Sequence, residues 1–126
     1  MAGIVVRAAH YPGRAPVDSY GNGGFRFAGM SHRGSLLCLP SGIYGWDPEG
    51  RIDRETLARV FEEADRIEVL LIGTGREMIP LDPALSGALR EHGIVSDAMS
   101  TGAAVRTFAV LLAEDRAVAA ALLAVD

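Results

Sequence analysis

Two short turns rich in glycine and hydroxyl side chains hold the residues best suited to chemistry. One turn spans residues 73–76, the other spans residues 100–102, and an arginine follows at position 106. Each turn follows an apolar run that predicts a buried strand. Parallel strands would bring both turns to one edge of a sheet, where open α/β folds bind ligands. The predicted ligand-binding residues are Gly73, Thr74, Gly75, Arg76, Ser100, Thr101, Gly102 and Arg106.

The chemistry expected at this edge is the binding of a small anion, such as a phosphate or carboxylate group. Backbone N–H groups at a helix start attract negative charge, and Arg76 and Arg106 would strengthen that attraction. A structural interpretation competes with this one. In it the glycines only shape the turns, and Ser100 or Thr101 only caps the helix. The ligand site is therefore a hypothesis.

A second feature is the segment 42–47, which combines glycines with Tyr44 and Trp46. Aromatic side chains in a glycine-containing loop often anchor a binding partner. A small packing cluster beneath a loop is an equally good explanation. Tyr44 and Trp46 are therefore the predicted partner-binding residues.

Other chemistries find no support in the sequence. All twelve basic residues are arginine, so there is no P-loop lysine. Met78 stands where a dinucleotide-binding fingerprint would have its third glycine, and no Gly-x-Ser-x-Gly motif is present. The three histidines lack the spacing of metal ligands. We therefore predict no catalytic residue, no metal and no cofactor, and the sequence favours a protein without enzymatic activity.

Composition limits the partners and the compartment. The 126 residues suit one domain, and a net charge of −4 with scattered arginines argues against nucleic acid. Cys38 is the single cysteine, so no internal disulfide can form. Charged residues interrupt the apolar region 103–125, and the first residues are too short an apolar stretch for a signal peptide. We expect a cytoplasmic protein without a transmembrane segment.

The N-terminal half is predicted to hold few regular elements. Residues 1–23 are expected to form loops with short extended pieces, and 1–17 an irregular segment. Alternating residues predict a strand at 25–27, and an apolar run predicts another at 35–39. With a turn at 29–33 between them, the two strands would form a hairpin.

The second half is predicted to alternate helices and strands. A helix should begin at the N-cap Asp53, with Leu57, Val60, Phe61 and Ala64 on its buried face. The later elements expected are a strand at 68–72, a helix at 83–92, a strand at 94–99 and a helix at 101–113. Residues 117–125 suit either a helix, because they are rich in alanine, or a short buried strand, and we expect the strand, partly because of the family resemblance given below. The strands at 68–72 and 94–99 should be parallel neighbours. The residues expected to be almost fully buried are Phe61, Leu70, Leu71, Leu89 and Leu111.

Four segments together resemble a known family: 18–26, 34–42 with Trp46, 70–75, and 93–107. In order and spacing they are similar to the family called domain of unknown function 498. That family is related to the mitochondrial assembly factor number three of respiratory complex I. The resemblance covers about residues 18–125 and implies an α/β fold of three layers, (β+α)/β/α. Its central sheet is expected to be mixed and mostly parallel.

The resemblance also shapes the expected function. It brings no catalytic residues, and the mitochondrial members act by binding other assembly proteins. We therefore expect a non-enzymatic binding or assembly module that aids biogenesis of a respiratory membrane complex by binding other proteins. The alternative is a small-anion or nucleotide-binding protein, or a cryptic enzyme, that uses the glycine turns. A homo-oligomer stays open.

Overall fold

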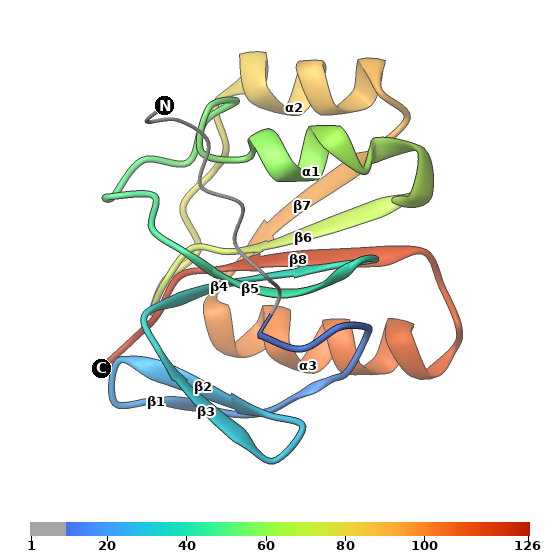
Figure 1. Ribbon diagram of the computed structural model, residues 1–126. Coiled ribbons are helices and arrows are strands. Elements are labelled where there is room, and N and C mark those ends of the chain that lie inside the picture. Colours follow the sequence, from blue (N-terminus) through green and yellow to red (C-terminus); the bar gives the residue numbers. More distant parts are fainter. Residues whose placement is uncertain (1–9) are drawn as a thin grey trace, which may run out of the picture.

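A five-stranded sheet forms the centre of the molecule, in the order β5-β4-β8-β6-β7 (Figure 1). The computed structural model of the chain describes residues 10–126. The strands of this sheet are β4 Ser35–Leu39, β5 Gly42–Trp46, β6 Val69–Gly73, β7 Val95–Met99 and β8 Val118–Leu122. β6 pairs in parallel with β7 and β8, whereas β4 pairs antiparallel with β5 and β8. The sheet is therefore mixed, as expected, but parallel pairings do not predominate.

Helices cover both faces of the central sheet. The short helix α1 Ala58–Glu62, the 3-10 turn Ala64–Arg66 and helix α2 Pro83–Glu91 lie on one face (Figure 1). Helix α3 Thr101–Ala113 lies on the other. Among the described helices, none has the length and apolar character that crossing a membrane requires.

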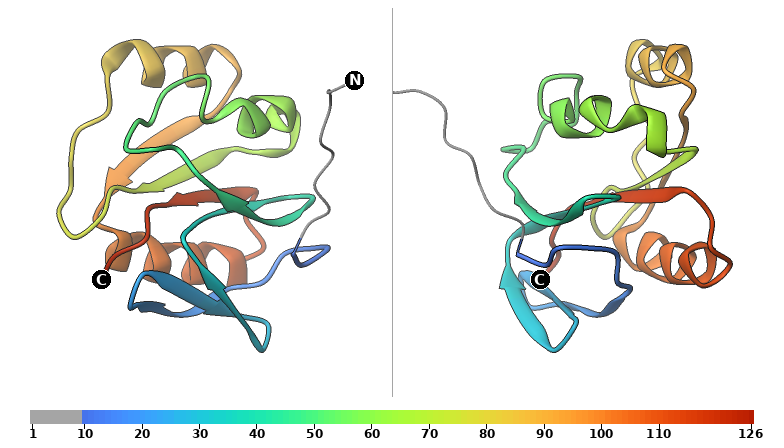
Figure 2. Two further views of the ribbon diagram at one scale, coloured as in Figure 1. Left: turned by 60° about the vertical axis from the view of Figure 1, so that its left-hand side comes forward. Right: turned by 45° about the vertical axis from the view of Figure 1, so that its right-hand side comes forward.

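A second, three-stranded sheet lies beside α3, on the same side of the central sheet (Figures 1 and 2). Its strands are β1 Val17–Gly21, β2 Gly24–Phe27 and β3 Met30–Arg33, paired antiparallel in sequence order.

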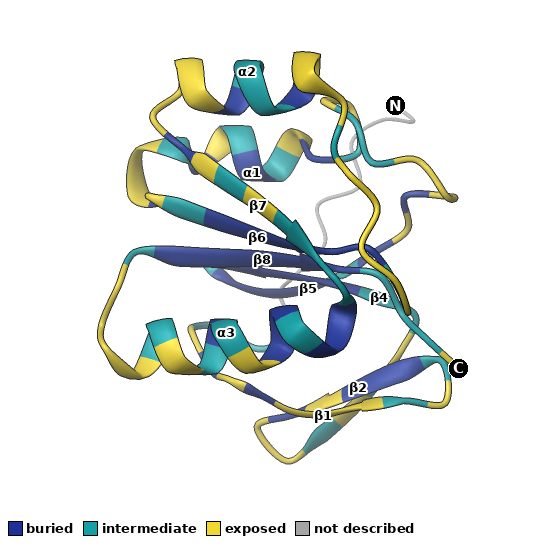
Figure 3. Cartoon of the chain, turned by 180° about the vertical axis from the view of Figure 1, so that it is seen from behind, coloured by how far each residue is buried: buried dark blue, intermediate teal, exposed yellow. Residues whose placement is uncertain are grey.

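Two apolar clusters fill the spaces on either side of the central sheet. Successive strand residues point to opposite faces, so Leu71 joins the cluster under α3 and Leu70 joins the cluster under α1 and α2. β6 and β8 are buried on both faces (Figure 3), which explains their unbroken apolar sequences. The predicted burial of Leu70, Leu71 and Leu89 is confirmed.

The β6-α2-β7 unit agrees with the sequence-based prediction. The Asp82 side chain accepts a hydrogen bond from the Ala84 N–H at 2.9 Å, and Pro83 occupies the first helical position. The predicted parallel pairing of β6 and β7 is confirmed. The strand predicted at 117–125 is β8, which is shorter than expected.

The hairpin predicted between residues 25–27 and 35–39 is wrong, because β2 pairs with β1 and β3 instead. Ala28 and Gly29 both have positive φ, 49° and 76°, which makes a tight two-residue turn after Phe27. The predicted turn at 29–33 is therefore mostly strand β3. β1 likewise lies inside the region expected to be loop, and residues 1–9 of the expected irregular segment lie outside the described residues.

The helix predicted from Asp53 begins later and is shorter. Asp53 does cap a turn, because its carboxylate accepts from the Thr56 N–H at 2.9 Å and its own N–H donates to Thr56 Oγ1 at 3.0 Å. That turn precedes α1. Phe61 and Leu111 are only partly buried, against prediction. The Phe61 ring packs against the apolar cluster under α1 and α2 and meets the His92 ring edge-on, with 5.0 Å between the centroids.

Candidate functional site

The carboxyl edge of the sheet holds the first candidate site. Gly73 and Met99 are paired in register at the ends of β6 and β7, so the two glycine turns lie together. A shallow hollow of about 340 Å³ opens there. Five of the eight predicted ligand residues line it: Gly75, Arg76, Ser100, Gly102 and Arg106, together with Tyr20, Val125 and Asp126.

Both threonines predicted to bind a ligand use their hydroxyl groups internally. Thr74 Oγ1 lies 2.6 Å from the Glu77 carbonyl oxygen and accepts from the Ile79 N–H at 2.9 Å. Thr101 Oγ1 donates to the Leu123 carbonyl at 2.8 Å and accepts from the Gly75 N–H at 3.0 Å. Both residues are buried. The two hydroxyl groups therefore stabilise the turns.

The glycines at this edge allow close packing. A Cβ atom at Gly73 would come within 2.9 Å of Thr101 Cα, and one at Gly102 would collide with the hydroxyl of Tyr20. Tyr20 thus lies against the N-terminus of α3, where an anion was expected. Ser100 caps the helix by accepting from the Ala103 N–H at 3.3 Å. The structure gives these residues structural contacts, and their ligand-binding role stays a prediction.

Exposed arginine and apolar side chains lie at and next to this hollow, together with the acidic residues Glu77 and Asp126. Arg76 and Arg106 are exposed, and neither donates a hydrogen bond or forms an ion pair to a described residue. Met78 and Ile79, in the loop after β6, are 55% and 60% exposed, and Tyr20 is 43% exposed. We call Tyr20, Arg76, Met78, Ile79 and Arg106 the edge patch.

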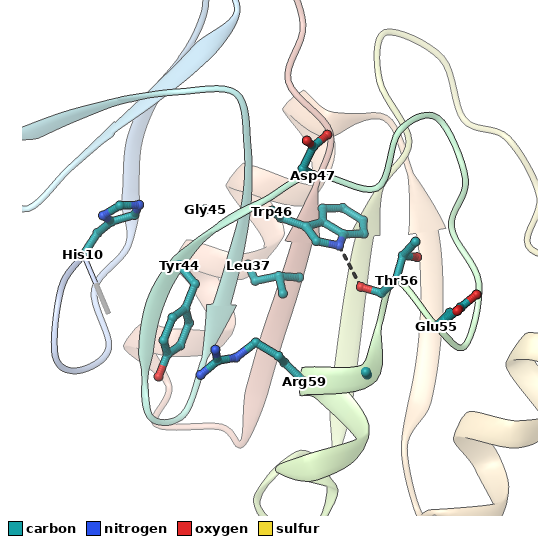
Figure 4. A pocket seen from close by; sticks show the side chains of 10 residues that line it. His10, Leu37, Tyr44, Gly45, Trp46, Asp47, Glu55, Thr56 and Arg59 are labelled. Carbon is teal, nitrogen blue, oxygen red and sulfur yellow. Dashed lines mark hydrogen bonds between the residues drawn. The ribbon is translucent and has the colours of Figure 1, made fainter. Parts of the chain in front are cut away.

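A second hollow, of about 290 Å³, lies between β5 and α1 (Figure 4). The segment predicted to be an aromatic loop is strand β5, so Tyr44 and Trp46 alternate onto the face that carries α1. Both are largely buried, with 8% and 9% exposed. Trp46 Nε1 donates to the Thr56 carbonyl at 2.8 Å. Tyr44 and Trp46 form a wall of the hollow, and their role in binding a partner stays a prediction.

Arg59 is the residue of this hollow that sequence reasoning missed. Its guanidinium carbon lies 3.9 Å from the centre of the Tyr44 ring. Figure 4 shows the two side chains next to each other. Its Nε is buried and has no hydrogen-bond partner in the described part of the chain. In the helix predicted from the sequence, Arg59 lies with Arg54 and Glu62 on a charged face, and such a face predicts a solvated surface. No sequence signal therefore distinguishes Arg59 from these neighbours.

A buried carboxylate lies near the same hollow. Glu63 accepts hydrogen bonds from the N–H and the hydroxyl of Ser41, at 2.9 and 2.6 Å, and from Arg66 at 3.1 Å. The Ser41 hydroxyl also bonds the hydroxyl of Tyr44. The charge of Glu63 is thus balanced by Arg66 and Ser41, and Tyr44 is fixed in position.

The single cysteine and two of the histidines were further candidates for reactive or metal-binding side chains. Burial raises the pKa of the Cys38 thiol to about 12, which keeps it protonated and unreactive. The rings of His10 and His32 lie 5.0 Å apart, and burial lowers the pKa of His32. Within residues 10–126, no group of three or more His, Cys, Asp or Glu side chains is arranged to hold a metal ion.

Known proteins of similar sequence identify the family of this chain. The family described as "Protein of unknown function (DUF498/DUF598)" matches residues 17–123. The chain belongs to this family. Among solved members of similar structure is a crystal structure named as an outer membrane protein from Bartonella henselae. It is 65% identical with a TM-score of 0.90, over 93% of this chain and 100% of that one.

Two further comparisons extend the DUF498/DUF598 relationship. An NMR structure from Rhodopseudomonas palustris is 48% identical, with a TM-score of 0.80, over 98% of this chain and 93% of that one. The Mus musculus protein named NADH dehydrogenase (ubiquinone) 1 alpha subcomplex assembly factor 3 is 30% identical over 95% of this chain. The chain spans 66% of that relative's length. The resemblance stated from the sequence is thus confirmed.

Proposed function

We propose that this DUF498/DUF598 protein is a non-enzymatic binding module that helps assemble a larger protein complex. The name of the mouse relative, an assembly factor of NADH dehydrogenase, supports a role of this type at the level of the family. The proposed destination is a respiratory membrane complex, and the proposed site of action is the cytoplasm. The partners are other proteins.

The observation that carries this proposal is the composition of the edge patch. Tyr20, Arg76 and Arg106 line the hollow, and the exposed Met78 and Ile79 follow Arg76 in the loop after β6. Neither arginine forms an ion pair with a described residue. Tyrosine, methionine and arginine are enriched in protein interfaces, and tyrosine and arginine supply many of the residues that dominate binding energy. Large apolar side chains gathered at a surface commonly mark an interaction site.

The patch is also held in a fixed shape before any partner arrives. Thr74 binds the loop that carries Met78 and Ile79, through the backbone of Glu77 and Ile79. Thr101 ties Gly75 to the end of β8. A surface that is already ordered loses less entropy on association, so more of the contact energy becomes affinity.

The test is capture of partner proteins by variants of the full chain. Met78→Asp combined with Ile79→Asp should abolish capture of the proteins that the wild type retains from lysate with membranes kept. Subunits and assembly proteins of a respiratory complex are the expected partners. Val95→Asp is the matched control, because Val95 is 62% exposed but lies at the opposite end of β7. Unchanged capture by the double variant would refute the edge patch as the binding surface.

A second candidate function is the binding of a small anion at the same edge. Arg76 and Arg106 line one hollow, and neither is paired with a described residue. Titration calorimetry with phosphate and nucleotides should then show binding that Arg106→Ala weakens without loss of fold. No heat of binding to the wild type across such a panel would remove this alternative.

A further inference from the structure

Arg59, in the hollow between β5 and α1, has unused capacity for hydrogen bonding. Stacking on Tyr44 engages only the flat face of the guanidinium group, and none of its nitrogens donates a hydrogen bond to a described residue. The carboxylate one helical turn further on, Glu63, is bound instead by Ser41 and Arg66. A buried donor without a partner costs free energy, so such an arrangement in a native fold calls for an explanation.

The hollow around Arg59 has room and an apolar wall. Leu37, Tyr44, Trp46 and Ala58 line it, and its volume is about 290 Å³. The Trp46 indole is fixed by its hydrogen bond to the Thr56 carbonyl (Figure 4), and Tyr44 is fixed by its hydrogen bond with the Ser41 hydroxyl. Small ligand sites are usually lined by apolar and aromatic side chains with a few polar or charged groups, and here the charged groups are Arg59, Asp47 and Glu55.

The charged groups at this hollow select the charge of the ligand. A guanidinium group presents paired N–H donors that match the two oxygens of a carboxylate. Asp47 and Glu55 also line the hollow, and both are exposed. Their negative charge would repel a phosphate dianion more strongly than a carboxylate carrying one charge. His10 also lines this hollow.

We propose that this hollow binds a monocarboxylate with an apolar or aromatic body. The carboxylate oxygens accept hydrogen bonds from Arg59, and the body packs against Tyr44 and Trp46. The carboxylate is that of a free small molecule or of an acidic side chain in a peptide, since both present the same group. This site lies on α1 and β5, away from the edge patch, so it goes beyond the proposed function.

The first experiment titrates the full chain with benzoate and phenylacetate, followed by amide chemical shifts. Saturable shifts are expected for β5 and α1, centred on Tyr44, Trp46 and Arg59. Benzamide, which keeps the ring but lacks the charge, should bind at least about tenfold more weakly, since a hydrogen bond to a charged group is lost. Phenylphosphonate should also bind more weakly than benzoate. Equal shifts with benzoate and benzamide would overturn the proposal.

The second experiment removes the cation. Arg59→Gln should weaken benzoate binding by about tenfold or more, and Arg59→Lys should retain part of the affinity because it keeps the charge. Arg54→Gln is the matched control in the turn that precedes α1, because the Arg54 guanidinium instead covers the ring of Phe61 at 4.7 Å. Thermal unfolding of each variant checks the fold. Benzoate affinity unchanged in folded Arg59→Gln would refute the role of Arg59.

A third experiment, with peptides, distinguishes the two sources of the carboxylate. A blocked dipeptide Phe-Glu is compared with Phe-Gln. Glu-selective shifts at the same residues would assign the site to a protein ligand, whereas benzoate binding without peptide binding would assign it to a small molecule. No saturable shift with any carboxylate would overturn the proposal. The Met78→Asp, Ile79→Asp variant should bind benzoate normally, so failure here and failure of the edge patch are distinguishable.

Discussion

The two hollows that hold the candidate sites are similar in size, but they differ in whether their buried polar groups have hydrogen-bond partners. At the carboxyl edge the hydroxyl groups of Thr74 and Thr101 are buried and fully used, while the arginines stand exposed at the surface. Between β5 and α1 it is a cation, Arg59, that is partly buried and has no hydrogen-bond partner among residues 10–126.

This difference indicates different occupants. An edge whose internal polar groups are satisfied gains mainly from covering Met78 and Ile79, which a flat protein surface does well. A recess with an unpaired guanidinium nitrogen gains mainly from one complementary charge, which a single carboxylate supplies. Under the two proposals, a polar atom left unsatisfied is a better indicator of a ligand than a glycine-rich turn.

The largest effect is expected from the core that supports the carboxyl edge. Leu71 is 2% exposed and lies in the apolar cluster under α3. Leu71→Ala should lower the free energy of unfolding by about 2–5 kcal/mol, through lost burial and the cavity left behind. Chemical denaturation measures this loss. Leu111→Ala, at a partly buried position of the same cluster, should cost clearly less, and a loss at residue 71 below about 1 kcal/mol would contradict the assignment.

The next effect tests whether the edge hydroxyl groups are structural. Thr101→Val keeps the shape of the side chain but leaves the Leu123 carbonyl and the Gly75 N–H without their partner. A loss of about 1–3 kcal/mol in unfolding free energy is expected. Thr107→Val, elsewhere on α3, should stay within about 0.5 kcal/mol of the wild type. If Thr101→Val were equally mild, the hydroxyl would be free for a ligand and the contrast between the two hollows would fail.

The elements around the carboxyl edge were largely predictable from the sequence. β6 and β7 are runs of apolar or alternating residues bounded by turns, and α2 carries a strong start signal in Asp82 and Pro83. These signals are local, and tertiary contacts reinforce them. The prediction that Gly75, Arg76 and Arg106 meet followed from parallel pairing alone.

The elements around the β5–α1 hollow were less predictable. The three-stranded sheet was hard to predict as well, because its turn at Ala28 depends on a non-glycine residue with positive φ, which sequence patterns rarely reveal. β5 was mistaken for a loop because its glycines hid the alternation of Ile43, Tyr44 and Trp46. The sequence pattern makes Arg59 look like a solvent-exposed helix residue. Its actual environment comes from Tyr44 on β5, a separate element whose packing against α1 the local pattern does not reveal.

The smallest effect concerns pH, since the two regions differ in which charges can change. The charged residues of the edge patch are both arginines, and a guanidinium group keeps its charge throughout the ordinary pH range. The β5 side carries His10 and His32, whose rings lie 5.0 Å apart. Burial, together with the charge of His10, holds the pKa of His32 below its ordinary value of 6.5, although a hydrogen bond to the Ser35 carbonyl opposes this.

The sign of the pH effect follows from that lowered pKa. Between 6.5 and the lower pKa of the folded state, the unfolded chain binds more protons at His32 than the folded chain does. Stability is therefore unaffected well above pH 6.5 and falls as the pH drops through this window. Urea unfolding at about pH 8 and about pH 5.5 should show this loss in the wild type, and a smaller one in His32→Gln. His10→Gln should reduce the loss by less, because it removes only the weaker cause. An identical loss in His32→Gln would show that the pH dependence arises from other groups.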